Sequence, residues 1–112
     1  MMLDQARIDE TRSLLGEETF AMFLQRLEVE FDEFVAWLDA TPTPAADEIA
    51  LRCHTLASSA GIYGASELRR TLLATEQVAQ SDTATKMTEL ADATRSITDV
   101  WAETLRAFRS IK

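Results

Sequence analysis

The one histidine of the 112-residue chain, His54, lies in the segment RCHTLASSAGIYGASEL at residues 52–68. An imidazole can act as a nucleophile or a proton carrier near neutral pH, where much of it is uncharged. Small residues follow it closely: Ala57, Ser58, Ser59, Ala60 and Gly61. Short side chains around an exposed histidine would let another protein come close to the ring.

A helix over residues 46–63 is predicted to turn His54 away from the core. At about 100° per residue, one face of this helix is apolar; it holds Ile49, Cys53, Leu56, Ala60 and Tyr63. His54 lies roughly 140° from the centre of that face, so we expect it to face water. Its neighbours on the same side are Asp47, Ala50, Leu51, Ser58 and Gly61. From periodicity alone, a surface histidine without a role is the simpler interpretation, and position does not decide between the two.

Two other groups of residues could carry chemistry, but simpler interpretations are favoured. Cys53 falls on the expected core face, where a thiol is unreactive because a thiolate needs an exposed, electropositive site. The acidic run EVEFDEF holds four carboxylates that could ligate a metal: Glu28, Glu30, Asp32 and Glu33. Di-iron four-helix bundles need Glu-x-x-His pairs from two helices, which a chain with one histidine cannot supply. We therefore expect these carboxylates to form a solvated acidic face without a metal. A metal-binding helical bundle remains as a less favoured hypothesis.

Composition narrows the class of partner. The net charge of −8 opposes binding to nucleic acid or to an anionic membrane, since both attract basic surfaces. No apolar run approaches the roughly 18 residues of a membrane helix, and the N-terminus lacks the basic and apolar regions of a signal peptide. The single cysteine cannot form a disulfide within the chain. We expect a cytoplasmic protein that binds another protein or a small ligand.

The elements that position these residues are predicted to be helices, since apolar residues recur at steps of three and four. The clearest break is DATPTPAADE at residues 39–48, which holds both prolines of the chain. Before it, the apolar positions are Phe20, Phe23, Leu24, Leu27, Phe31, Phe34 and Leu38. Near the C-terminus they are Met87, Leu90, Ala91, Thr94, Ile97, Trp101, Leu105 and Phe108. A shorter helix lies between them, marked by Leu68, Leu72, Thr75 and Ala79, and LDQARIDETRSLLG supplies a short N-terminal one.

These segments predict an all-α fold, an antiparallel up-down four-helix bundle with a short additional N-terminal helix. A single domain would occupy residues 1–112. Trp37 and Trp101 fall at helical spacing with other apolar residues, so core packing is their favoured role. At the break, Thr43 is predicted to cap the next helix and Pro44 to be its first residue.

The order of residues after His54 resembles the signature of histidine-containing phosphotransfer domains, known as HPt domains. In that family the phosphoryl-accepting His is followed by Leu at +2, often Lys at +3, Gly at +4 and Ser at +5, then by Gly-Ala at +10 and +11 and Leu at +14. Here these positions hold Leu56, Ala57, Ser58, Ser59, Gly64, Ala65 and Leu68. A Glu often seen at +22 falls on Glu76. Residues 3–31 resemble the family's leading helix and first bundle helix, so the resemblance spans most of the chain.

The resemblance implies that His54 accepts a phosphoryl group from a receiver-domain aspartate and passes it to another, within a multistep two-component phosphorelay. The chain would supply the nucleophile, Nε2 of His54, and a docking face formed by Ala50, Leu51, Ala57, Ser58 and Gly61. It would be a phosphocarrier rather than an autonomous enzyme, since no Gly-rich motif offers a nucleotide site. We expect no cofactor on this chain, because Mg²⁺ would belong to the receiver partner.

The expected partners are receiver domains of response regulators, with a hybrid histidine kinase as a further candidate. We expect a monomer, and because the chain begins with Met, a free-standing protein.

Two positions depart from the family pattern: the frequent Lys is Ala57 and the frequent Gly is Ser58. Arg69, Arg70 or the hydroxyl of Ser58 could replace the missing cation near the phosphoryl oxygens. The alternative is a degenerate interaction module that binds a receiver or kinase without carrying phosphate.

Overall fold

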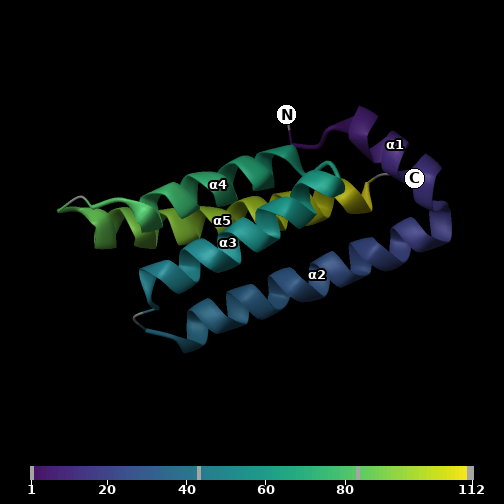
Figure 1. The fold of residues 1–112 in the computed structure, drawn as a ribbon. Helices are drawn as coiled ribbons and strands as arrows, with labels where there is room; N and C mark the ends of the chain where they lie inside the picture. The colour runs from purple at the N-terminus through teal and green to yellow at the C-terminus, as the bar shows by residue number, and fades with distance from the viewer. Residues whose placement is uncertain (1, 43, 83, 111–112) are drawn as a thin grey trace.

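The computed structural model describes residues 2–42, 44–82 and 84–110, and its elements are five α-helices joined by short connections (Figure 1). The helices are α1 (Gln5–Leu15), α2 (Glu17–Ala40), α3 (Ala46–Ile62), α4 (Ser66–Gln80) and α5 (Lys86–Arg109). Within the described ranges there is no β-strand. The all-α prediction is confirmed, and the two longest apolar patterns correspond to α2 and α5, the two longest helices at 24 residues each.

Helix α3, which carries His54, begins at Ala46, in agreement with the predicted range of 46–63 but not with the predicted cap. Pro44 lies outside the helix, so its assignment as the first helical residue is wrong, and Thr43, the predicted cap, lies outside the described residues. The N-cap is Ala45, whose carbonyl oxygen accepts from the backbone N–H of Glu48 at 3.1 Å. Asp47 and Glu48 lie in the first turn, where carboxylates interact favourably with the positive end of the helix dipole.

The core lies between the four longer helices, which run lengthwise beside one another in Figure 1. Helix α4 packs against both α3 and α5, and α2 contacts both α3 and α5. Phe31 of α2 stacks on Trp101 of α5, with ring centroids 4.5 Å apart and planes 18° apart. Trp101 is buried, as predicted. Trp37 is half-buried, and the guanidinium of Arg52 lies 4.1 Å from its ring centroid.

Small residues bring α3 and α4 close together. Ala57 and Ala60 of α3 are 2 % and 0 % exposed, and Leu68 and Leu72 of α4 are fully buried in the same core cluster. Since alanine keeps a side chain to one methyl group, the leucines of α4 can approach the backbone of α3. Several of the small residues after His54 therefore serve the helix contact as well as the surface.

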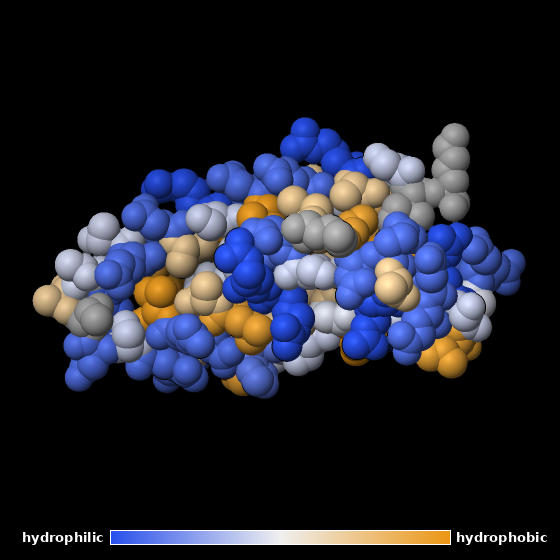
Figure 2. All heavy atoms as spheres, turned by 90° about the horizontal axis from the view of Figure 1, so that it is seen from above, coloured by the Kyte–Doolittle hydropathy of each residue, from blue (hydrophilic) through white to orange (hydrophobic). Residues whose placement is uncertain are grey.

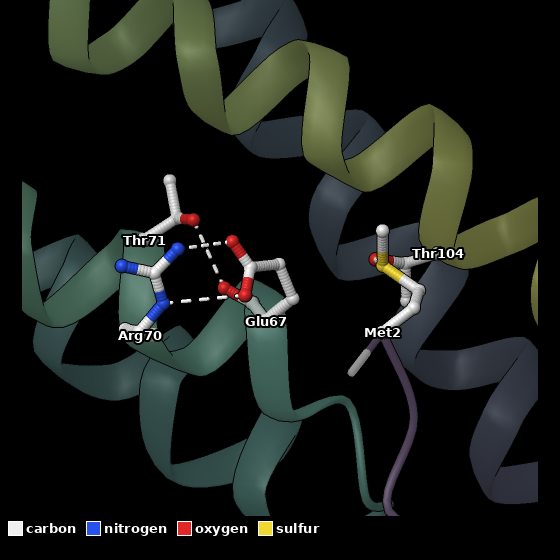
Figure 3. Close-up of polar contacts among 5 residues, drawn as sticks. All are labelled: Met2, Glu67, Arg70, Thr71 and Thr104. Carbon is white, nitrogen blue, oxygen red and sulfur yellow. Dashed lines mark hydrogen bonds and ion pairs between the residues drawn. The ribbon is translucent and has the colours of Figure 1, made fainter.

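The N-terminal segment is fastened over the turn between α3 and α4. The backbone N–H of Asp4 donates to the carbonyl of Gly64 at 2.7 Å, and that of Glu67 donates to the carbonyl of Met2 at 3.4 Å. Figure 3 shows the Met2 sulfur pointing at the Thr104 hydroxyl of α5, which lies 3.3 Å from it. Gly64 has a φ of +75°, a conformation that favours glycine. These contacts tie α1 to the end of α3 that follows His54.

The surface is largely polar. On the face that carries α4, Figure 2 shows hydrophobic areas as separate patches among hydrophilic ones. The large apolar side chains that are exposed are Leu14, Met22, Val29, Leu51, Ile62 and Met87. No helix within the described ranges is long and apolar enough to cross a membrane.

Candidate functional site

His54 lies near the middle of α3 with its ring turned outward. Its side chain is 64 % exposed, so the prediction that it faces water is confirmed. On the opposite side of the same helix, Ile49, Cys53 and Ala60 are buried. The outward direction therefore follows from helical periodicity. The buried residues recur at steps of three and four on one face of α3, and His54 does not fall on that face.

Glu76 of α4 fixes one nitrogen of the His54 ring. Its Oε2 and Oε1 lie 3.1 Å and 3.4 Å from Nδ1 of His54, and the Glu76 side chain is only 17 % exposed. A carboxylate only accepts hydrogen bonds, so the hydrogen belongs on Nδ1 in this arrangement. In the neutral ring the lone pair then lies on Nε2, which is the nitrogen free to attack an electrophile.

An open hollow of about 740 Å³ lies beside the ring. Helices α3, α4 and α5 all contribute to its wall, which is lined by Ala46, Asp47, Ala50, Leu51, His54, Glu76, Ala79, Gln80 and Lys86. Two of the five α3 residues among them are alanines. A group arriving at His54 from a partner protein has room here.

The five residues predicted to form the docking face occupy different environments. Leu51 is 66 % exposed, Ser58 is exposed and Gly61 is half-buried. Ala50 and Ala57 are 6 % and 2 % exposed, so both offer little side-chain surface to a partner, although Ala50 lines the hollow beside His54. Helix α3 packs against both α2 and α4, and this two-sided packing covers positions that a single core face would leave open. Docking by these five residues stays a prediction, and Leu51, Ser58 and Gly61 are the ones with accessible surface.

A comparison with protein families assigns the chain. The model of the Hpt domain matches residues 18–110, most of the sequence and all of α3, α4 and α5. The chain belongs to the Hpt domain family. No curated protein and no solved structure matches it. The match confirms the family indicated by the residues around His54.

Two residues of this Hpt domain that bear on the site were missed or only touched on from sequence. Glu76 lies 22 residues after His54, where the family often has Glu, but this offset alone predicts no role for its carboxylate. The sequence predicts no role for Lys86, which lines the same hollow as His54. The offset of Glu76 from His54 could have indicated that the two side chains meet. Nothing in the sequence position of Lys86 indicates that the start of α5 lines the same hollow as His54.

The cations expected to replace the missing Lys are not gathered around the His54 ring. Arg70 forms an ion pair with Glu67, its neighbour on α4 (Figure 3), and this contact lowers the pKa of the Glu67 carboxyl. Arg69 extends over Gly61, where an added Cβ would lie 3.0 Å from its Cδ. The hydroxyl of Ser58 donates back to the carbonyl of His54 at 3.3 Å. Arg69 and Ser58 line a second hollow of the Hpt domain, separate from the one beside the ring.

Cys53 and the acidic run add no reactive group to the Hpt domain. Burial raises the pKa of the Cys53 thiol to about 12, with Glu76 adding to the effect, so the thiol stays protonated near neutral pH. Glu28 of the acidic run is paired with Arg109 of α5 at 3.1 Å. Across the described part of the chain, no three His, Cys, Asp or Glu residues are grouped as metal ligands.

Proposed function

We propose that this Hpt domain is a phosphocarrier in which His54 accepts a phosphoryl group from the aspartate of one receiver domain and delivers it to another. The observation that carries the proposal is the arrangement of the His54 ring. It is exposed, its Nδ1 faces the Glu76 carboxylate at 3.1 Å, and its Nε2 is left for attack. The family match supports phosphotransfer as the general activity.

In the proposed reaction the lone pair of Nε2 attacks the phosphorus of an aspartyl phosphate. A P–N bond forms as the P–O bond to the aspartate breaks, and the aspartate leaves as a carboxylate. The ring gains positive charge during this step, and the Glu76 carboxylate beside Nδ1–H stabilises it. The transition state is loose, so positioning and charge neutralisation matter more than covalent assistance. The reverse reaction delivers the group to a second receiver.

This chain and the receiver domain contribute different parts of the proposed reaction. The chain supplies the nucleophile on a rigid helix, with Leu51, Ser58 and Gly61 as surface for docking, while Mg²⁺ belongs to the receiver. We propose that the four longer helices act as an antiparallel up-down bundle whose packing holds His54 in place. We further propose a cytoplasmic monomer whose partners are response-regulator receivers and a hybrid histidine kinase. Such encounters are transient, so a modest interface suffices.

The test uses a receiver domain carrying ³²P on its aspartate. We expect label to pass to the wild-type chain, and His54→Gln to abolish it. The label should be stable in alkali and labile in acid, which is the behaviour of a phosphohistidine. Thr55→Gln is the matched control, because it places the same side chain at the next exposed position of α3 and should leave transfer intact. Circular dichroism checks that both variants remain helical.

A second candidate is favoured by one observation. Ala57 stands where the family often has Lys, and it is buried, so that position supplies no cation to a phosphoryl group. On this reading the same fold binds a receiver or kinase without carrying phosphate. Failure of every receiver to label the chain, together with binding that is unchanged in His54→Gln, would select this function over phosphotransfer.

A further inference from the structure

The hollow beside His54 has an unbalanced set of charges. Besides the ring, its lining holds two carboxylates, Asp47 of α3 and Glu76 of α4, and one cation, Lys86 at the start of α5. Each of the three packed helices therefore contributes one charged group. Since both carboxylates repel an anion, Lys86 is the one lining residue whose charge attracts a phosphoryl group.

Lys86 has no other evident role. In the described ranges, no carboxylate lies within ion-pair distance of it, whereas Glu76 faces His54 and Asp47 accepts from the backbone N–H of Glu48 at 3.0 Å. It is the first residue of α5, where a cation interacts unfavourably with the positive end of the helix dipole. Neither a salt bridge nor helix stability accounts for a lysine here.

A phosphoryl group on Nε2 would change the electrostatics of this hollow. It brings a charge of about −1.5 to −2 near neutral pH, close to the Glu76 carboxylate that already contacts the same ring. Lysine suits such a group because its ammonium carries three donors on a flexible four-carbon stem. Lys86 is half-buried, which limits the surrounding water that screens its charge.

We propose that Lys86 binds the phosphoryl group carried by His54, with its ammonium donating to the phosphoryl oxygens across the hollow. The role rests on the proposed function of His54 as phosphoryl acceptor. It assigns to α5 the cation that neither Arg69 nor Arg70 of α4 supplies beside the ring. On this proposal α3 carries the phosphoryl group on His54 and α5 supplies the cation that binds it.

The test uses phosphoramidate as a small phosphoryl donor, so no receiver is needed. The donor reacts with its nitrogen protonated: Nε2 of His54 attacks the phosphorus, a new P–N bond forms as the P–N bond of the donor breaks, and the nitrogen leaves as ammonia. We expect Lys86→Gln to be labelled about tenfold more slowly than wild type, the loss typical of one charge-assisted hydrogen bond. Lys86→Arg should recover most of the rate.

The matched control is Arg106→Gln, which removes one positive charge from the same helix at an exposed position outside the hollow. It should be labelled at the wild-type rate. A rate for Lys86→Gln equal to that of the control overturns the role of Lys86 while leaving His54 as the carrier. Failure of the wild-type chain to be labelled by either phosphoramidate or a receiver overturns the proposed function, and the role of Lys86 with it.

A second measurement separates phosphoryl binding from a structural effect. The ³¹P chemical shift of phospho-His54, followed against pH, reports the second ionisation of the phosphoryl group. A nearby ammonium favours the dianion, so the pKa of the phosphoryl group should be higher in Lys86→Gln than in wild type by about one unit. Equal values in the two proteins contradict direct contact, whatever the labelling rates are.

Discussion

Oε2 of Glu76 lies 3.1 Å from Nδ1 of His54, and this contact joins α4 to the outward face of α3. The carboxylate is only 17 % exposed while the ring is 64 % exposed, so α4 holds the anion and solvent surrounds the rest of the imidazole. Nδ1 of the ring therefore has its hydrogen-bond partner within the domain. The other ring nitrogen is available to a partner.

Removing this carboxylate should slow phosphotransfer modestly without unfolding the domain. Glu76→Ala deletes the acceptor that selects the Nδ1–H form of the ring. Since a partly exposed ion pair contributes roughly 0.2–1 kcal/mol, we expect the rate of labelling to fall by a factor of about 1.4 to 5. The ¹⁵N shifts of the His54 ring should show a smaller fraction with the hydrogen on Nδ1. An unchanged tautomer ratio would show that the contact does not orient the ring.

Leu51 is the apolar anchor expected at the docking surface. It is 66 % exposed and lines the hollow beside His54. Leu51→Ala should weaken binding to the cognate receiver by about fivefold or more, because truncation of a central apolar contact typically costs over 1 kcal/mol. Val29→Ala on α2 is the control, since Val29 is 51 % exposed and lies outside that hollow. Equal affinities of the two variants in calorimetric titration would place the docking surface elsewhere.

Much of the fold was predictable because its apolar pattern is strongly periodic. Phe31 and Trp101 belong to the two longest patterns and meet in the core. The outward direction of His54 followed from the same periodicity. The start of α3 was less predictable, since Pro44 is compatible with a first helical turn and equally with the non-helical position that it occupies.

The site was harder to predict because it is assembled between helices. Periodicity places residues around one helix, but it does not say which flanks the neighbouring helices cover. For that reason Ala50 and Ala57 were expected to take part in docking and are buried. Lys86 reaches the hollow only through the packing of α5 on α4, which the spacing of one sequence does not encode.

The stacked pair in the core should dominate stability. Trp101 is 6 % exposed and lies on Phe31 with centroids 4.5 Å apart. Trp101→Ala should reduce the free energy of unfolding by about 3–5 kcal/mol, through lost burial and the cavity left behind. Met87→Ala, at a position 64 % exposed on the same helix, should change it by less than about 0.5 kcal/mol. Urea unfolding followed by far-ultraviolet circular dichroism measures both, and similar losses would contradict this account of the core.

Cys53 should make stability fall at alkaline pH. Burial raises the pKa of its thiol from 9.0 to about 12, so the folded state holds the proton more tightly than the unfolded chain. This contribution is fully present below the unfolded value and is lost as pH rises from about 9 towards 12. Cys53→Ala should show a shallower decline between pH 8.5 and 10.5. In the native wild-type protein the thiol should also react slowly with a disulfide reagent at pH 8, and rapidly once unfolded in urea.

Gly64 and Gly16 provide a matched test of what fastens the N-terminal segment. Both have positive φ, +75° and +85°. An added Cβ at Gly64 would lie 2.8 Å from Cγ1 of Ile8 and 2.9 Å from the carbonyl oxygen of Asp4, whereas one at Gly16 meets nothing within 4 Å. Gly16 also has a ψ of 158°, a backbone region nearly confined to glycine, so Gly16→Ala should cost only the backbone strain of that region, about 1–3 kcal/mol.

Gly64→Ala adds a steric clash to the strain of its own positive φ, so it should cost about 2–5 kcal/mol. The clash falls on the contact between α1 and the turn after α3, where Asp4 donates to Gly64 and the Thr11 hydroxyl donates to the carbonyl of Ile62 at 3.0 Å. Hydrogen exchange should therefore accelerate first at the amides of α1 in Gly64→Ala. Unchanged protection of the α1 amides in Gly64→Ala would show that the close approach at Gly64 is not what holds α1 in place.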